Sequence, residues 1–370
     1  MKQTTFTLAL SLAALPSIGA AATLEELEAR ITQLEEELAL TADESKDNAR
    51  ALSDMATISG YADVEFYDKS GKDNDTSFRI HHISLFLKKQ LSDKIRFFSE
   101  IEFEDAAKID NTGGSSFSSD SFGKLFVEAV SIDYLANPML NFRFGRFFTP
   151  AGIWNIDHYP PFVPTQERPL HIRNMFPQLN DGALVYGAIG MGSTVLSYDL
   201  YTGNGIQDKD RYTNPKEDGN ATKALGTRLT FAFPVLDLTE IGVSYLNDKF
   251  NSGNSKISRG VHAKAKFANV TLQAEGAHAK NYNDTAIDNL GYYLQAMYDW
   301  NQWTFGGRYD VYDSNRSVDD DETLRKTAFV NYHFTKDVVA KLEYHRDSND
   351  SKTPRSSRLT MASIAVNLGN

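Results

Sequence analysis

The sequence has no cysteine, no excess of basic residues and, beyond residue 22, no long hydrophobic run. Without cysteine there can be no disulfide scaffold, thiol nucleophile or thiolate metal site. No apolar run approaches the ~20 residues that a transmembrane helix needs. The 49 acids outnumber the 38 bases, which argues against a nucleic-acid-binding protein. The 370 residues do include 23 Phe and 17 Tyr, too many aromatics for a disordered chain, so a β-rich or mixed fold remains.

The first 22 residues have the pattern of a secretory signal peptide. Lys2 provides the positive start, an apolar stretch follows at residues 6–15, and small residues occupy positions 19–22. The apolar stretch is too short to favour an uncleaved membrane anchor. We therefore expect residues 1–22 to direct export.

Residues 23–54 have the heptad spacing of a coiled-coil helix. The apolar positions are separated by alternating steps of three and four, at Leu24, Leu27, Ile31, Leu34 and Leu38. Ten acids and three bases lie between positions 25 and 54, so most of the net charge of −11 belongs to this segment. Because so short a helix is marginal alone, we expect it to associate with copies of itself. The alternative is a solvated spacer.

From residue 56 to residue 370, apolar and polar residues alternate with period two in some sixteen segments. Between residues 58 and 67, for example, Val64 and Phe66 share one face, whereas Asp63 and Glu65 share the other. Short and long connections alternate, as in outer-membrane barrels with short periplasmic turns and longer outer loops. The pattern predicts an all-β fold, a transmembrane antiparallel β-barrel of about 16 strands, wide enough for an aqueous channel.

A soluble β-sandwich would also alternate, but the polar face here is charged on nearly every segment, as a water-filled lumen requires. Aromatic residues also gather near the predicted strand ends, where they suit the interfacial girdles of a membrane barrel. The predicted girdle residues are Tyr61, Phe78, Phe142, Trp154, Tyr201, Tyr245, Tyr298, Trp300, Trp303, Tyr312 and Tyr332.

The longest connection, residues 155–180, follows the fifth predicted strand and is therefore the third outer loop. Five of the eleven prolines of the chain lie in it, which makes it stiff. A loop of this length in a compact barrel is usually functional. We expect it to fold into the lumen as a constriction, with charge supplied by Asp157, His158, Glu167, Arg168, His171 and Arg173. The alternative is a loop that points outward or toward a neighbouring subunit.

Alternation also assigns charged side chains to the pore wall. The acids come from the first, third and fourth strands, and the bases mainly from the fifth, eighth and tenth. The predicted wall residues are Glu65, Glu100, Glu102, Glu104, Glu128, Arg143, Arg146, Arg228, Lys264, Lys266 and Arg308. Opposed arcs of charge would create a transverse field across the pore. The alternative is that these charges pair with neighbours. Arg143 and Arg146 can share a face only if the strand is irregular near Gly145.

No motif for catalysis, a metal or a cofactor is present. His81 and His82 are adjacent, so on a regular strand they point to opposite faces. His82 and Ser84 share a face, but a third catalytic partner is not evident. The sequence predicts that the protein is not an enzyme and that it needs no cofactor.

The run LFVEAVSIDYLANPMLNFRFGRFFTPAGIWN (125–155), followed by HYPPF and ERP, resembles a family of Gram-negative porins. This broad family includes the phosphate-selective porins O and P and related channels with an N-terminal coiled coil. GYADVEFYD (60–68), FFSEIEFED (97–105) and YDLYTGNG (198–205) are similar to it as well. The resemblance implies a sixteen-stranded barrel, a trimer and the passage of small hydrophilic solutes.

Together these patterns predict a porin of the Gram-negative outer membrane with its N-terminal helix in the periplasm. Its expected partners are outer-membrane lipid, small hydrophilic solutes and two further copies of the chain, which associate through the barrel walls and the coiled coil. Two alternatives remain: a channel specific for anions (phosphate, carboxylates) or iron chelates, and an envelope tether with no transport role.

Overall fold

A computed structural model describes residues 56–70, 75–105, 124–205, 222–249, 255–282, 288–319, 321–349 and 356–369. The chain divides into two units, Met1–Asp54 and Met55–Asn370. The predicted signal peptide and coiled coil belong to the first unit and lie outside the described residues. Among the described residues, no helix combines the length and apolar character needed to cross a membrane.

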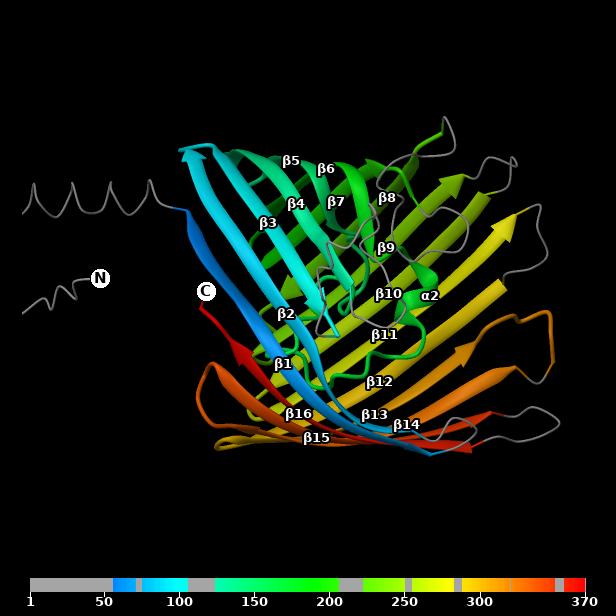
Figure 1. Cartoon of the computed structure of the whole chain (residues 1–370). Helices are drawn as coiled ribbons and strands as arrows, with labels where there is room; N and C mark the ends of the chain where they lie inside the picture. Colours follow the sequence, from blue (N-terminus) through cyan, green and yellow to red (C-terminus); the bar gives the residue numbers. More distant parts are fainter. Residues whose placement is uncertain are drawn as a thin grey trace, which may run out of the picture. The chain divides into compact units, whose positions relative to one another are not determined.

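The second unit is a closed antiparallel barrel of sixteen strands, which confirms the predicted fold (Figure 1). Each strand pairs with the next along the chain, and β1 pairs with β16 to close the sheet. The strands are β1 (Thr57–Ser70), β2 (Asp75–Ser92), β3 (Ile95–Glu104), β4 (Lys124–Asn137), β5 (Leu140–Phe148), β6 (Leu179–Met191), β7 (Thr194–Gly203), β8 (Ala224–Phe233), β9 (Leu238–Lys249), β10 (Ser255–Phe267), β11 (Val270–Tyr282), β12 (Asp288–Trp300), β13 (Trp303–Asp313), β14 (Glu322–His333), β15 (Val338–Asn349) and β16 (Ser356–Asn367). One short helix, α2 (Ile172–Met175), lies between β5 and β6.

The period-two pattern of the sequence separates an apolar outer face from a polar inner face. In β1, Val64 is 49% exposed on the outside, whereas its neighbour Asp63 is buried inside. Closure pairs the backbone groups of all sixteen strands with neighbouring strands, as a sheet surrounded by lipid requires.

The short turns lie at the same end of the barrel as the start of β1 and the end of β16 (Figure 1). Five of the short turns contain only two residues each, at 93–94, 138–139, 192–193, 268–269 and 301–302. In the last two, the first residues Ala268 and Asn301 have φ of 46° and 54°, the left-handed conformation that matches the twist of a tight hairpin.

Two β-bulges alter the inner face that regular alternation predicts. Asp63 pairs with His82 and Val64 pairs with Ile80, so His81 is an extra residue in β2. His81 and His82 therefore both point inward, and each imidazole Nδ1 lies near the Asp63 carboxylate, at 3.2 and 2.8 Å. The prediction that these two histidines face opposite sides is wrong because it assumed a regular strand.

The second bulge is in β4, where Glu128 is the extra residue. Glu100 pairs with Ala129, and Ile101 pairs with Val127. Glu128 and Ala129 are both buried, whereas Val127 and Val130 on either side are exposed. The bulge therefore adds one carboxylate to the inner face.

The predicted aromatic girdle is correct in part. Tyr298, Trp300 and Trp303 are exposed large aromatics near the short turn at 301–302. Tyr61 and Tyr201 are instead almost completely buried. Because an aromatic near a strand end can serve either face, position along the strand did not distinguish the two roles.

Candidate functional site

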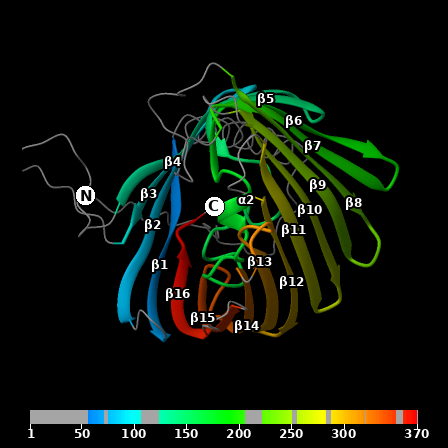
Figure 2. The same cartoon turned by 90° about the vertical axis from the view of Figure 1, so that its right-hand side faces the viewer.

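The connection between β5 and β6 lies inside the ring of strands, as the view toward one end of the barrel shows (Figure 2). Its apolar side chains pack against inward-facing apolar residues of the wall. One cluster joins Met175 and Phe176 of this loop to wall residues that include Ala224, Leu246 and Ala277. A second joins Trp154, Val163 and Ile172 to Tyr293 of β12. Apolar residues on an otherwise polar inner face thus form a small core that holds the loop.

The first polar anchor of the loop is Glu275 of β11. Its carboxylate accepts hydrogen bonds from the backbone N–H groups of Ile153 (3.0 Å) and Trp154 (3.4 Å). Gly152 has a φ of 57°, and a Cβ at this position would lie 1.8 Å from the Glu275 Oε1 atom. Arg228 Nε completes the anchor by donating to the Gly152 carbonyl at 3.0 Å. A glycine is therefore required where the loop meets the wall.

A second anchor satisfies the carbonyl groups of the proline-rich part of the loop. The Lys341 ammonium donates to the carbonyls of Pro160 (2.5 Å) and Val163 (2.6 Å). Asn331 donates to the carbonyl of Pro164 at 3.0 Å. A buried loop must find partners for its backbone polar groups, and here wall side chains replace the water that a surface loop would use.

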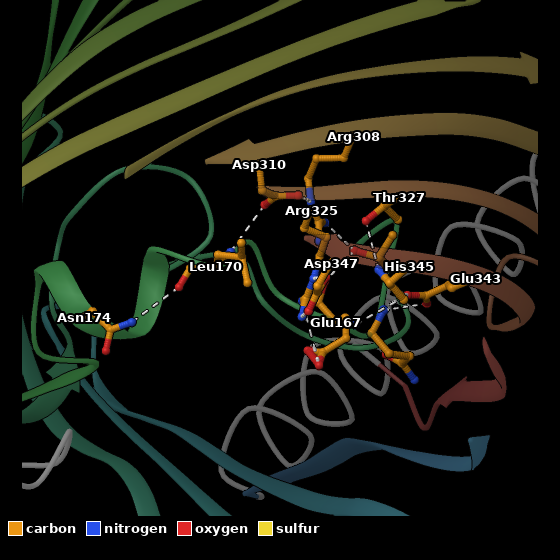
Figure 3. A network of polar contacts seen from close by, with 12 residues as sticks. Glu167, Leu170, Asn174, Arg308, Asp310, Arg325, Thr327, Glu343, His345 and Asp347 are labelled. Carbon is orange, nitrogen blue, oxygen red and sulfur yellow. Dashed lines mark hydrogen bonds and ion pairs between the residues drawn. The ribbon is translucent and has the colours of Figure 1, made fainter. Parts of the chain in front are cut away.

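A third anchor is built on Arg308 of β13 (Figure 3). Its guanidinium donates to the Thr165 hydroxyl (2.7 Å) and to the Glu167 carbonyl (2.9 Å) and pairs with Asp310 at 2.9 Å. Asp310 in turn accepts from the Leu170 N–H at 3.3 Å. The loop is thus held to β13 through a buried ion pair.

Glu343 of β15 forms a fourth anchor for the same part of the loop. Its carboxylate accepts from the backbone N–H groups of Gln166 (2.6 Å) and Glu167 (3.4 Å). The imidazole of His345 lies 3.1 Å from Glu343 and 2.8 Å from the Thr327 hydroxyl. Figure 3 shows these residues converging on one side of the loop. Alternation alone places Glu343 inward, but nothing in the sequence indicates that it binds loop backbone rather than water.

The predicted loop residues divide into two groups. Asp157 and Arg173 are exposed, and Glu167 and Arg168 are partly exposed. His158 and His171 are buried, the first against Phe148 and the second against Tyr293. The rings of these two histidines fill the space between the loop and the wall, so they do not supply charge to the lumen directly.

Burial determines the protonation of both histidines. Desolvation lowers the pKa of the His171 imidazole to about 3, and the nearby Arg308 charge adds to the effect. The pKa of His158 is lowered well below its usual value, again mainly by burial and then by the charge of Arg168. Both rings are therefore neutral at physiological pH. When the pH falls, histidines of the unfolded chain take up a proton, whereas these two rings stay neutral in the folded protein.

These shifts predict a loss of stability in acid. The unfolded chain binds more protons than the folded chain as pH falls from about 6.5 towards 3, the pKa of His171, so this histidine lowers the free energy of unfolding by roughly 1.4 kcal/mol per pH unit over this window. His158 adds a loss in the same direction. His171→Phe removes one titrating group and keeps a ring, so we expect a smaller drop in Tm between pH 7 and pH 4. His278→Gln, at a part-exposed histidine paired with Asp288, is the control and should not reduce the drop. An unchanged drop in His171→Phe would contradict this assignment.

The predicted acidic wall lies beneath the loop. Glu65, Glu100, Glu102 and Glu128 are directed inward, as alternation predicts, but all four are buried. Glu104 alone of the predicted acids remains partly exposed. Arg308 is likewise buried. The expected field between open walls of opposite charge therefore needs correction, because most of the acidic arc is covered.

The predicted basic residues other than Arg308 remain accessible and line two cavities. A cavity of about 540 Å³ is bordered by the bases Lys88, Arg96, Arg143, Arg146 and Arg228, together with Asp199. Arg143 and Arg146 reach the same cavity across Gly145, whose φ of 127° provides the irregularity that this arrangement requires. Lys264 and Lys266 line a second cavity, of about 510 Å³, together with Asp157 and Asp299. Lys88 and Arg96 were not among the predicted wall residues, although alternation on β2 and β3 would have found them.

Ion pairs offset only part of the positive charge in the first cavity. Asp133 pairs with Arg96 (2.6 Å) and with Arg143 (2.7 Å). Arg146 pairs with Asp181 at 2.6 Å, and Arg228 lies 3.9 Å from Asp199. Five bases thus face three carboxylates among the described residues around this cavity. The remaining excess of two positive charges makes it a region that attracts anions.

Comparison with known proteins gives a consistent family and fold. The family model described as Gram-negative porin matches residues 9–352. An uncharacterized protein of Aquifex aeolicus is 29% identical over 156 residues, which cover 42% of this chain; the chain spans about a third of the length of that curated relative.

Solved structures with the same fold include an anion-selective porin from Comamonas acidovorans, with a TM-score of 0.60, 13% identity and coverage of 85% of this chain and 99% of that one. Salmonella typhi OmpF, in a complex with daunomycin, has a TM-score of 0.60 and 14% identity over 85% and 98% of the two chains. A trimer form of OmpT from Vibrio cholerae has a TM-score of 0.54 and 13% identity over 85% and 100%. At these identities the likeness concerns the fold.

Proposed function

Because this chain belongs to the Gram-negative porin family, we propose that it is an outer-membrane channel through which small hydrophilic solutes diffuse passively. The observation that carries this function is the loop between β5 and β6, which is anchored inside a closed barrel with an apolar outer face. Such a barrel holds an aqueous lumen, and an inserted loop narrows it without closing it. This function requires neither a cofactor nor covalent chemistry.

The loop supplies the constriction in this proposal, over residues 156–176. Its anchors at Lys341, Arg308 and Glu343 hold it against the wall at several points, so its position is fixed rather than fluctuating. The side chains that would meet a solute are those that reach solvent: Asp157, Glu167, Arg168 and Arg173 from the loop, and Lys88, Arg143, Arg228, Lys264 and Lys266 from the wall. Charges at such positions set the preference for one sign of ion.

We further propose a preference for anions. The excess of positive charge around the cavity that contains Lys88 and Arg143 supports this preference, whereas the charges around the second cavity balance. Small anions, including phosphate and carboxylates, are therefore favoured over cations, and a channel specific for one such anion is the second candidate. The Comamonas acidovorans protein with the same fold is described as anion-selective.

Planar-bilayer recording tests the channel. We expect the purified protein to give steady, ohmic conductance, because a fixed constriction in an aqueous pore passes ions in proportion to voltage. Replacing residues 156–176 by a short Gly/Ser linker should raise the conductance of each channel by widening the lumen. Absence of conductance from correctly folded protein would contradict the porin function and favour the envelope tether. Unchanged conductance in the linker variant would remove the loop from the conduction path.

The assembly we propose is a homotrimer, formed through the barrel walls and the N-terminal heptad segment. A trimer is recorded for the OmpT protein of Vibrio cholerae, which has this fold. A periplasmic coiled coil and membership of the phosphate-selective branch remain predictions from the sequence. Deleting residues 23–54 and measuring the mass of the detergent-solubilised assembly separates the contribution of the heptad segment from that of the barrel walls.

A further inference from the structure

Three carboxylates converge beneath the loop on the inner face of β3 and β4. Glu100 and Glu102 alternate on β3, and Glu128 is the residue that the β4 bulge adds. They are 0%, 3% and 1% exposed, and each offers a carboxylate oxygen within 4.8 Å of the others. Three carboxyl groups in so small a buried volume can all be ionised only if a cation lies between them, and otherwise they take up protons.

Each carboxylate is oriented by a neutral donor. Ser84 Oγ donates to Glu100 Oε1 at 2.7 Å, and Tyr61 OH donates to Glu102 Oε2 at 2.6 Å. Gln178 of the loop donates to Glu128 Oε1 at 2.8 Å. These donors come from three different segments and fix one oxygen of each carboxylate, but they bring no positive charge. Such outer partners are typical of groups that hold an ion.

A buried histidine of the loop is directed at the same point and lacks a hydrogen-bond partner. His158 is 5% exposed, and neither of its ring nitrogens forms a hydrogen bond with the described residues. Its Nε2 atom lies 3.7 Å from Glu128 Oε1, and Glu128 Oε2 has no hydrogen-bond partner either. Among the described residues, no lysine or arginine forms an ion pair with any of the three glutamates. The cluster therefore contains unused donor and acceptor atoms around three closely spaced carboxyl groups.

We propose that Glu100, Glu102 and Glu128 bind a hard divalent cation of the Ca²⁺ type, next to His158. Carboxylate oxygens are the preferred ligands of Ca²⁺, and oxygens up to about 4.8 Å apart can share one ion at metal–oxygen distances of 2.3–2.6 Å. The neutral imidazole of His158 would accept a hydrogen bond from a water on the ion. Because His158, Gln178 and Tyr159, which donates to Glu100 at 3.3 Å, belong to the loop, the ion would fasten the constriction loop to β3 and β4.

Lanthanide luminescence tests this site directly. Tyr61 and Tyr159 lie beside the glutamates, so exciting tyrosine should sensitise Tb³⁺ bound there. The full chain, refolded in detergent without lipopolysaccharide and stripped of metal, is titrated with Tb³⁺ and then with Ca²⁺ as competitor. We expect one site per chain, displacement by Ca²⁺, and at least a tenfold loss of Tb³⁺ affinity in Glu128→Gln. Glu343→Gln, which alters another buried carboxylate that holds the loop, is the matched control and should bind as the wild type does.

A second measurement, of Tm, distinguishes loss of metal binding from misfolding of the variant. Ca²⁺ should raise, and EDTA should lower, the Tm of the folded wild-type barrel, and neither should change the Tm of Glu128→Gln. A proton shared among the glutamates would instead make the Tm depend on pH and not on Ca²⁺. The proposal is overturned if the wild type binds neither ion, or if Glu128→Gln binds Tb³⁺ as tightly as the wild type. Conductance of Glu128→Gln then shows independently whether the porin function stands.

Discussion

Replacing Arg308 by alanine is expected to lower the stability of the barrel strongly and to raise its conductance. The guanidinium is completely buried, donates to Thr165 and to the Glu167 carbonyl, and lies over the Trp154 ring at 5.6 Å. Its removal leaves the buried Asp310 carboxylate without its partner, which costs about 3–5 kcal/mol. The loop also loses its central anchor, so heat should unfold the barrel at a lower temperature and single channels should conduct more current.

Two controls distinguish the effect of breaking the Arg308–Asp310 ion pair from the effect of losing any arginine. Arg346→Ala removes an exposed arginine from β15 and should leave both Tm and conductance near the wild-type values. Asp310→Asn combined with Arg308→Ala removes the uncompensated charge, so the double variant should recover part of the lost stability. If Arg308→Ala alone matches the wild type in both measurements, then Arg308 does not hold the loop.

The barrel could be predicted from sequence because period-two alternation is a local property. Val64 and Ile364 are exposed on the outer face, and Asp63 and Ser363 are buried on the inner face, as alternation requires. Lipid on one side and water on the other impose this pattern on every strand. Strand count and the side on which the ends lie follow from the alternation of short and long connections.

The bulges could not be predicted, since they add a residue without a distinctive sequence signal. His81 and Glu128 lie within long alternating strands, and only the pairing register reveals that each has an adjacent residue on its own face. Both additions carry ionisable groups to the region beneath the loop. An interpretation that assumes strict alternation therefore assigns the residues of this polar cluster to both faces of the sheet. In the folded chain they all lie on the inner face.

The sequence predicts a loop that folds into the lumen, but it does not predict the contacts that hold this loop. Its prolines and length indicated a functional loop, yet its position depends on wall residues far away in sequence, such as Glu275 and Lys341, which are 122 and 181 positions from their loop partners. These side chains have the same charge and the same alternation as residues that face water. Tertiary packing decides whether a carboxylate such as Glu100 lines the lumen or lies beneath the loop. The composition of the sequence does not indicate which of the two positions it takes.

Changing one lysine in the basic cavity should shift the ion preference of the channel. Lys88 is directed inward from β2 into the cavity that Arg96, Arg143 and Arg228 also line. Lys88→Glu removes the local excess of positive charge, because it replaces one positive by one negative charge. For charges about 8 Å from a permeating ion in a partly aqueous lumen, we expect the permeability ratio of chloride to potassium to fall roughly fivefold. The reversal potential in a KCl gradient measures this ratio.

The same substitution outside the lumen is the control for that experiment. Lys336 lies in the short turn after β14, its side chain is 83% exposed, and it is 3.4 Å from Asp337. Lys336→Glu changes the net charge of the protein by the same amount, but water and salt screen it from the ions in the pore. If both variants move the reversal potential equally, net charge rather than the cavity sets selectivity. If neither moves it, ions do not pass the basic cavity, and the anion preference must be abandoned while the channel itself remains.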